Sequence, residues 1–234
     1  MRVADKLTQI AWNEQKVYDS GYSKAEYDFW NSFTYGGKRR NYSYAFFNSG
    51  FEYIRPTFKL VGTRDTSAAN MFAESKKLKK VESAYVDFSQ KALGFSNAYS
   101  YYFTFSLCEK LEEIEDIGFK ADEWGYQGTF ERCFKLHTIA VIRTAQHTKF
   151  ANTFFECNAL ENLTIEGIIG QNGFNVQYST KLTHDSLMSI INALADYSAD
   201  TSGTTWTVTL GSGNIAKLTE EEQLIAYMKG WNLA

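Results

Sequence analysis

The stretch FFECNALENLTI at residues 154–165 carries the pattern Phe-x-x-Cys-x-x-Leu-x-x-Leu-x-Ile, and the chain repeats this pattern. Earlier copies begin at Phe130, Phe105 and Phe72, the last with Ser in place of Cys. The successive starts lie 33, 25 and 24 residues apart. A self-similar period of about 20 to 50 residues is typical of stacked repeats, because one unit cannot bury its apolar edge alone. The sequence therefore predicts a solenoid in the middle of the chain.

The recurring positions predict which side chains form the core of each repeat. The Phe-x-x-Cys part suits a short helical turn, and the part that follows suits a short strand. Alternation along the strand is expected to turn Ile139 and Val141 inward, and Leu163 and Ile165 in the next copy. The structural repeat positions are Phe72, Leu78, Val81, Phe105, Cys108, Leu111, Ile114, Phe130, Cys133, Leu136, Ile139, Phe154, Cys157, Leu160 and Leu163.

The three cysteines, Cys108, Cys133 and Cys157, hold the same position in successive repeats. Stacking would place them in a column inside the solenoid, where a free cysteine behaves as a small apolar residue. A disulfide would leave one thiol unpaired, and the metal-type spacing Cys-x-x-Cys is missing. We therefore expect a packing ladder.

Composition narrows the class of protein. The chain has 234 residues and a net charge of −3, which argues against nucleic acid or an acidic membrane as the partner. Aromatic residues make up 16% and there is one proline, the opposite of a disordered chain. No apolar run approaches the roughly 18 residues of a membrane helix, so no membrane insertion is expected. The N-terminus has no secretory-signal pattern, which predicts synthesis in a cytoplasm without a signal peptide.

Residues 1–33 are expected to form an N-terminal helical segment, with one helix over 3–18 and a second over 23–33. A helix here could cap the open end of the first repeat. It could equally dock against another copy and form a homo-oligomer, although so short a heptad seam is marginal alone in water. The seam consists of Val3, Leu7, Ile10 and Val17.

The solenoid is expected to span residues 34–170. Residues 45–49 read as the start of an irregular first repeat, and residues 58–61 as a short strand. The outward strand positions are the candidate binding face, since solenoids use such surfaces for partners. The alternative is a solvated face with charge pairs between the basic run 76–80 and the acidic run 109–116. The candidate binding residues are Lys80, Glu82, Glu113, Glu115, Thr138, Ala140, Asn162 and Thr164.

Residues 171–234 follow a different pattern, which predicts a helix–strand–helix cap. Thr183 suits the N-cap of a helix over 184–197. Residues 204–210 alternate as a strand, and Thr219 with Glu222 forms a capping box ahead of a last helix. This module would close the far end of the solenoid.

Over about residues 45–182 the repeat line resembles the BspA-type leucine-rich repeats of bacterial surface and phage-encoded proteins. Residues 3–18 are similar to the opening, and residues 182–191 and 210–231 to the closing module, of phage and prophage proteins of gut Firmicutes. The resemblance implies an α/β repeat fold: a leucine-rich-repeat solenoid with an N-terminal helix and a C-terminal α/β capping module. It implies an interaction module and supplies no catalytic residues. The chain departs from the pattern at Ser75 and in its first repeat.

Three functions follow from this reading. The first is a non-enzymatic, virion-associated protein of the tail or baseplate, which presents the repeat surface to a protein or a cell-surface glycan. The second is a bacterial surface adhesin of the BspA type. The third and least favoured is a cell-wall glycan hydrolase, which needs two carboxylates at a defined separation. Glu112, Glu113, Glu115 and Asp116 lie on a charged strand edge, and His137, His147 and His184 are isolated, so we expect no catalytic set, metal or cofactor.

Overall fold

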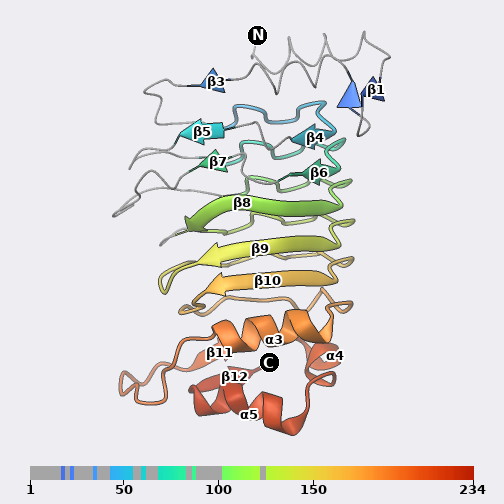
Figure 1. The fold of residues 1–234 in the computed structure, drawn as a ribbon. Coiled ribbons are helices and arrows are strands. Elements are labelled where there is room, and N and C mark those ends of the chain that lie inside the picture. Colours follow the sequence, from blue (N-terminus) through green and yellow to red (C-terminus); the bar gives the residue numbers. More distant parts are fainter. Residues whose placement is uncertain are drawn as a thin grey trace.

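The computed structural model describes residues 43–54, 68–82, 102–121 and 125–234, together with the backbone of five short strands. These strands are β1 (Val17–Tyr18), β2 (Tyr22–Ser23), β3 (Thr34–Tyr35), β5 (Lys59–Val61) and β7 (Val86–Asp87). Figure 1 shows the chain stacked in successive rungs, each a turn segment followed by a strand. The three strands β3, β5 and β7 pair in parallel in that order, so the strand expected near residues 58–61 is present as β5.

The larger sheet has five parallel strands in the order β10-β9-β8-β6-β4. Their bounds are Tyr53–Ile54 for β4, Lys80–Val81 for β6, Glu113–Ala121 for β8, Thr138–Thr144 for β9 and Asn162–Gly167 for β10. Lys80 pairs with Glu113, Glu113 with Thr138, and Thr138 with Asn162. Equivalent repeat positions therefore lie side by side on neighbouring strands.

The phenylalanine of each repeat forms a continuous column through the core. Phe46 and Phe72 have ring centroids 5.1 Å apart, and the column continues through Phe105, Phe130 and Phe154 at 5.6, 6.0 and 6.1 Å. Every ring in the column is almost completely buried. Stacked aromatic rings at such separations attract one another beyond the burial of their area. The irregular first repeat thus contributes Phe46 to the same column as the regular ones.

The turn segments are not helical, so that prediction is wrong. The residues two before and two after each Phe adopt left-handed backbone, with φ between +50° and +64°. Every left-handed non-glycine residue in the described part of the chain lies at one of these positions. The pairs are Tyr44 and Asn48, Asn70 and Glu74, Phe103 and Leu107, Gly128 and Arg132, and Asn152 and Glu156. A helix cannot contain residues of this hand at such spacing, so the chain flattens into a ribbon of tight turns.

The flattened turns exchange backbone hydrogen bonds with the next rung, much as parallel strands do. The Phe105 N–H donates to the Thr129 carbonyl at 2.9 Å, and the Arg132 N–H donates to the Phe155 carbonyl at 2.8 Å. Left-handed backbone costs a non-glycine residue roughly 1–2 kcal/mol, and it persists where the surroundings hold it. The hydrogen bonds between rungs are what hold it here.

The cysteine ladder is a hydrogen-bonded ladder as well as an apolar one. All three cysteines are free and buried, as expected. Each thiol donates to the carbonyl of the Phe one rung earlier, and Ser75 does the same with its hydroxyl. The pairs are Cys108 with Phe72 at 3.3 Å, Cys133 with Phe105 at 3.1 Å, Cys157 with Phe130 at 3.0 Å, and Ser75 with Phe46 at 3.3 Å. The position requires a small side chain that can donate, which explains why serine replaces cysteine there.

One inward strand position differs from the prediction. Val141 is only half-buried, and its neighbour Ile142 is completely buried. The pairing of β9 with β10 shifts after Leu163, so Ile165 lies opposite Ile142. Strict alternation from Ile139 misses this irregularity because the extra residue leaves no sequence signal.

The stack continues past the expected boundary at residue 170. Val176, Ser179 and Leu182 are buried and take the Phe, Cys and Leu positions of one more turn segment. The Ser179 hydroxyl donates to the Cys157 carbonyl at 3.0 Å. Helix α3 (His184–Ala193) then lies where the next strand would come, directly beyond β10 (Figure 1).

Helix α3 provides hydrogen-bond acceptors for N–H groups at the open edge of the sheet. The N–H groups of Leu163 and Ile165 on β10 donate to the hydroxyls of Ser186 and Ser189, at 2.9 and 2.8 Å. An uncovered parallel edge would offer its N–H groups to another chain. The two serines, one helical turn apart, close the edge instead.

The C-terminal module has the predicted order of elements with shorter bounds. Thr183 caps α3 as expected, but the helix ends at Ala193 rather than at Tyr197. Tyr197 instead stacks on Trp206, with ring centroids 4.1 Å apart. The predicted strand over 204–210 is β11 (Trp206–Val208), which pairs in parallel with β12 (Trp231–Leu233). The short helix α4 (Ser212–Ile215) was not predicted.

Helix α5 (Glu220–Met228) begins with the expected Thr219–Glu222 capping box. Two lysines around it reach back to the stack, which sequence patterns did not indicate. The Lys217 ammonium donates to the carbonyls of Thr180 and Leu182, and the Lys229 ammonium donates to those of Ile191 and Asn192. They thereby satisfy carbonyls at the ends of the last turn segment and of α3.

The N-terminal predictions fall mostly outside the described residues. Of the helix expected over 3–18, only Val17 and Tyr18 are described, and they form β1, paired antiparallel with β2. The docking residues Val3, Leu7 and Ile10 and the rest of the helix expected over 23–33 after Ser23 lie outside the described part. Within the described part, no helix combines the length and apolarity needed to cross a bilayer.

The hydrogen-bonded thiol ladder predicts how substitutions of Cys133 rank. Cys133→Ala removes the donor to the buried Phe105 carbonyl and should lower the free energy of unfolding by about 1–3 kcal/mol. Cys133→Ser should lower it by less, because its hydroxyl can donate to the same carbonyl, as Ser75 does in its own rung. Urea unfolding followed by circular dichroism measures both. A serine variant less stable than the alanine variant would contradict the hydrogen-bonding role.

The ion pair between α3 and α5 predicts a pH dependence of the C-terminal module. His184 Nε2 lies 2.9 Å from Glu222 Oε1, and this hydrogen bond raises the pKa of His184 above its ordinary 6.5. The Thr219 backbone N–H, followed by His184, holds the pKa of Glu222 below its ordinary 4.5. The histidine contribution is lost as pH rises through its raised pKa, and the glutamate contribution is lost as pH falls through its lowered pKa.

The stabilising effect of the pair is therefore full between the two ordinary values and declines on either side. His184→Gln should lower the melting temperature relative to the wild type most at about pH 5.5, with a smaller difference at about pH 9. Both groups are solvent-accessible, so added salt should reduce the difference. A difference that grows toward high pH would show that the pair does not act in this way.

Candidate binding surface

The outward strand residues predicted from the sequence lie along one face of the five-stranded sheet. Ala140, Asn162 and Thr164 are exposed, and Lys80, Glu82, Glu113, Glu115 and Thr138 are half-buried. The register aligns Lys80, Glu113, Thr138 and Asn162 across four strands. The structure thus brings these residues together as one surface, which we call the strand face.

The part of the strand face on β6 and β8 is occupied by its own ion pairs. Lys80 Nζ lies 2.7 Å from Glu115 Oε1 and 3.3 Å from Glu113 Oε2. The hydrogen bond to Glu115 raises the pKa of Lys80 above its ordinary value. These charges satisfy one another across the strands, which matches the solvated-face alternative at this end.

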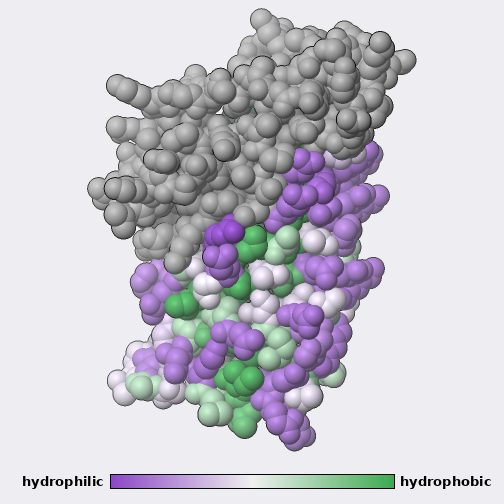
Figure 2. All heavy atoms as spheres, in the orientation of Figure 1, coloured by the Kyte–Doolittle hydropathy of each residue, from purple (hydrophilic) through white to green (hydrophobic). Residues whose placement is uncertain are grey.

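The strand-face residues on β9 and β10 are uncharged, and the nearest charges on these strands, Arg143 and Glu166, form an ion pair with each other at 3.1 Å. Asn162 Nδ2 donates to Thr138 Oγ1 at 3.3 Å, and His137 Nδ1 lies 3.0 Å from the same oxygen. Ala140 and Thr164 are small and exposed. Figure 2 shows pale and green atoms over the middle of this face, with purple atoms on both sides of them. A flat, neutral area of short side chains costs little to desolvate and suits a partner surface.

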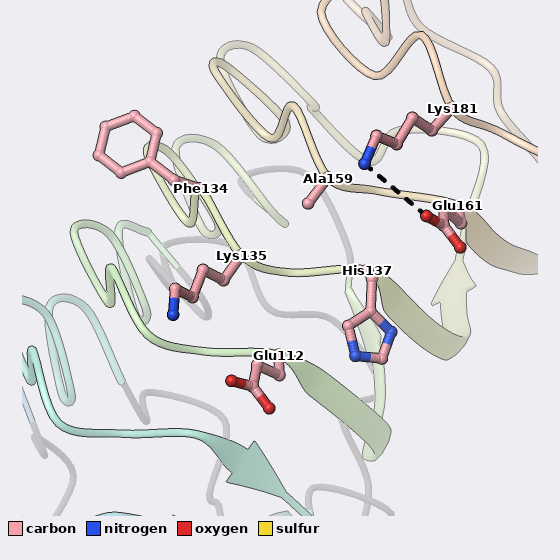
Figure 3. Close-up of a pocket in the computed structure, with 7 residues that line it drawn as sticks. All are labelled: Glu112, Phe134, Lys135, His137, Ala159, Glu161 and Lys181. Carbon is pink, nitrogen blue, oxygen red and sulfur yellow. Dashed lines mark ion pairs between the residues drawn. The ribbon is translucent and has the colours of Figure 1, made fainter.

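An open depression of about 580 Å³ adjoins the strand face where the turn segments meet the strands. Glu112, His137 and Glu161 hold the same repeat position, each immediately before its strand. The His137 N–H donates to the Glu112 carbonyl, and the Glu161 N–H donates to the His137 carbonyl, both at 2.9 Å. Figure 3 shows these side chains along three successive rungs. The complete lining is Glu112, Phe134, Lys135, His137, Ala159, Glu161 and Lys181.

A column of lysines runs beside the depression and was missed by the sequence reasoning. From the rung of Ser75 onward, the residue two places after the Cys or Ser is a lysine, except in one rung where it is Ala159; in the first rung Phe51 holds this place. The column is Lys77, Lys110, Lys135, Ala159 and Lys181. The signal was present in the repeat alignment, but it becomes a surface only once the turn segments are known to stack in register.

The buried cysteines offer no reactive site. Burial raises the pKa of all three thiols, that of Cys157 to about 12, so at neutral pH they stay protonated. The described residues hold no group of three or more His, Cys, Asp or Glu side chains placed around a metal ion.

The candidate acid–base residues are dispersed. Glu112 and Glu161 lie on alternate rungs on an open surface, with His137 between them. Glu113 and Glu115 pair with Lys80. His147 is exposed beyond β9, and His184 at the start of α3 pairs with Glu222 of α5. The side chain of Asp116 lies outside the described part.

Comparison with known proteins finds no matching family model, no matching curated protein and no matching solved structure.

Proposed function

We propose that this chain is a leucine-rich-repeat protein of the BspA type and acts as a non-enzymatic binding protein. The repeat line over residues 45–182, the parallel register of equivalent positions and the phenylalanine column support the repeat assignment. The proposed architecture is a solenoid closed by the C-terminal module, in which α3 covers the last strand.

The neutral half of the strand face is the observation that carries the binding role. Thr138, Ala140, Asn162 and Thr164 form a flat area on β9 and β10 whose side chains are neither buried in the core nor engaged in ion pairs. The area borders the open depression, so a partner could contact both at once. A protein or a glycan on a cell surface fits such a mixed surface.

The proposed setting is a phage or prophage particle, with the chain on the tail or baseplate. The resemblance of residues 3–18, 182–191 and 210–231 to phage and prophage proteins supports this setting. Quantitative mass spectrometry of purified particles from an induced host culture tests it. A fixed copy number relative to a known tail protein would support a virion component, and absence from particles with protein on the cell surface would favour the adhesin alternative.

Charges placed on the strand face test the binding role directly. Ala140→Arg and Thr164→Arg each add a long cation to the neutral area and should weaken binding of the labelled full chain to host cells about tenfold or more. Neither residue is buried, so the free energy of unfolding should stay within about 0.5 kcal/mol of the wild type.

The matched control is Gln146→Arg, which adds the same charge at an exposed residue just after β9. We expect this control variant to bind host cells as tightly as the wild type. Equal loss of binding by all three variants would point to net charge rather than to the strand face.

A further inference from the structure

The gap in the lysine column lies at the centre of the depression. Neighbouring strands lie about 4.8 Å apart, so Lys135 and Lys181, two rungs apart, are separated by roughly 10 Å along the column. Ala159 stands between them and has no side chain beyond Cβ. Figure 3 shows Ala159 between Lys135 on one side and Lys181 on the other. In Figure 3 the Lys135 side chain extends away from Ala159 and the Lys181 side chain turns toward Glu161. Both lysines are exposed, so both ammonium groups can turn toward a small group that enters over Ala159.

The two flanking lysines are weakly neutralised compared with other lysines nearby. Lys135 makes no ion pair with any residue that the structure describes, and Lys181 Nζ lies 4.0 Å from Glu161 Oε1. Lys79 and Lys80, by contrast, each have a carboxylate oxygen at 2.7 Å. The side chains of Lys181 and Glu161 are 61% and 47% exposed, so both can turn toward a ligand. An incoming anion would gain two charge-assisted hydrogen bonds without breaking a close ion pair.

The other lining groups favour hydroxyls over further negative charge. Glu112 and Glu161 can only accept hydrogen bonds when ionised, and His137 adds a ring nitrogen that can donate or accept. Phe134 is 41% exposed and lies at the rim, where it presents an apolar ring. Two carboxylates repel a polyacidic peptide, whereas the hydroxyls of a sugar would donate to them. The lining therefore selects a ligand with one anionic group and several hydroxyls.

We propose that the depression binds an acidic saccharide, with the sugar carboxylate over Ala159 between Lys135 and Lys181. Sugar hydroxyls donate to Glu112 and Glu161, and the apolar side of the sugar faces Phe134. This proposal specifies a ligand for the binding role proposed above. It rests on that role only because the depression adjoins the strand face. It names the ligand class as a carboxylated glycan.

The test uses the full chain and two pairs of probes that differ in their carboxylate. Sialyllactose is compared with lactose, and methyl glucuronide with methyl glucoside, by NMR titration. We expect at least one acidic probe to bind and its neutral partner to bind at least about tenfold more weakly, since each lost tenfold corresponds to about 1.4 kcal/mol.

Three variants locate the binding. Ala159→Lys introduces the lysine that the neighbouring rungs carry, and it should abolish binding because its side chain fills the gap although it adds positive charge. Lys135→Gln should weaken binding about tenfold. Lys110→Gln removes a lysine of the same column that does not line the depression, and it should leave the affinity unchanged. Thermal unfolding of each variant confirms that the fold is intact.

Four results would overturn the proposal. Tighter binding by Ala159→Lys, or equal losses for Lys110→Gln and Lys135→Gln, would show diffuse attraction to the lysine column. Failure of both acidic probes would exclude this ligand class, and so would preferential binding of a tetraglutamate peptide. Binding of an acidic sugar by a chain whose strand-face variants bind cells normally would keep this inference and reject the strand-face role, so the two failures are distinguishable.

Discussion

The structure depends on the backbone hydrogen bonds that join each turn segment to the next. Left-handed residues on both sides of each phenylalanine flatten the chain, so that its N–H groups point along the stack and meet carbonyls of the following rung. The phenylalanine rings then lie over one another, and the thiol or hydroxyl three residues later donates to a carbonyl of the rung before. Polar groups on both edges of a rung thereby form hydrogen bonds with the neighbouring rungs, so a single rung could not satisfy these groups alone.

This constraint explains how the stack ends and where its surfaces lie. The last turn segment, up to Leu182, has no following strand, and α3 supplies the missing acceptors through Ser186 and Ser189. Because all equivalent positions stack in register, a single repeat position becomes a line of side chains on the surface. The strand face and the lysine column are two such lines, and the depression lies where one of them is interrupted at Ala159.

Periodicity predicted the core well, because burial recurs at fixed positions: Phe130, Cys133, Leu136 and Ile139 are all buried. The predictions were wrong where backbone dihedral angles and strand register, rather than residue type, determine the structure. Left-handed φ at Arg132 or Glu156 has no signature in residue type, so the sequence pattern predicts helical turns where the backbone is not helical. The register shift that buries Ile142 instead of Val141 likewise has no signature in the sequence. The strand-face residues could be chosen from alternation alone, whereas the depression required the turn segments to be stacked.

The most direct test of this account is amide hydrogen exchange measured by NMR on the full chain. Gly128 and Arg132 lie in a turn segment outside the regular strands, and their N–H groups donate to the Ala151 and Phe155 carbonyls of the next rung at 2.9 and 2.8 Å. The account predicts that these two amides are protected like those of β9. The Phe134 amide, in the same turn segment, has no acceptor among the described residues and should exchange fast. Exchange of Gly128 and Arg132 as fast as Phe134 would contradict the stacked-turn account.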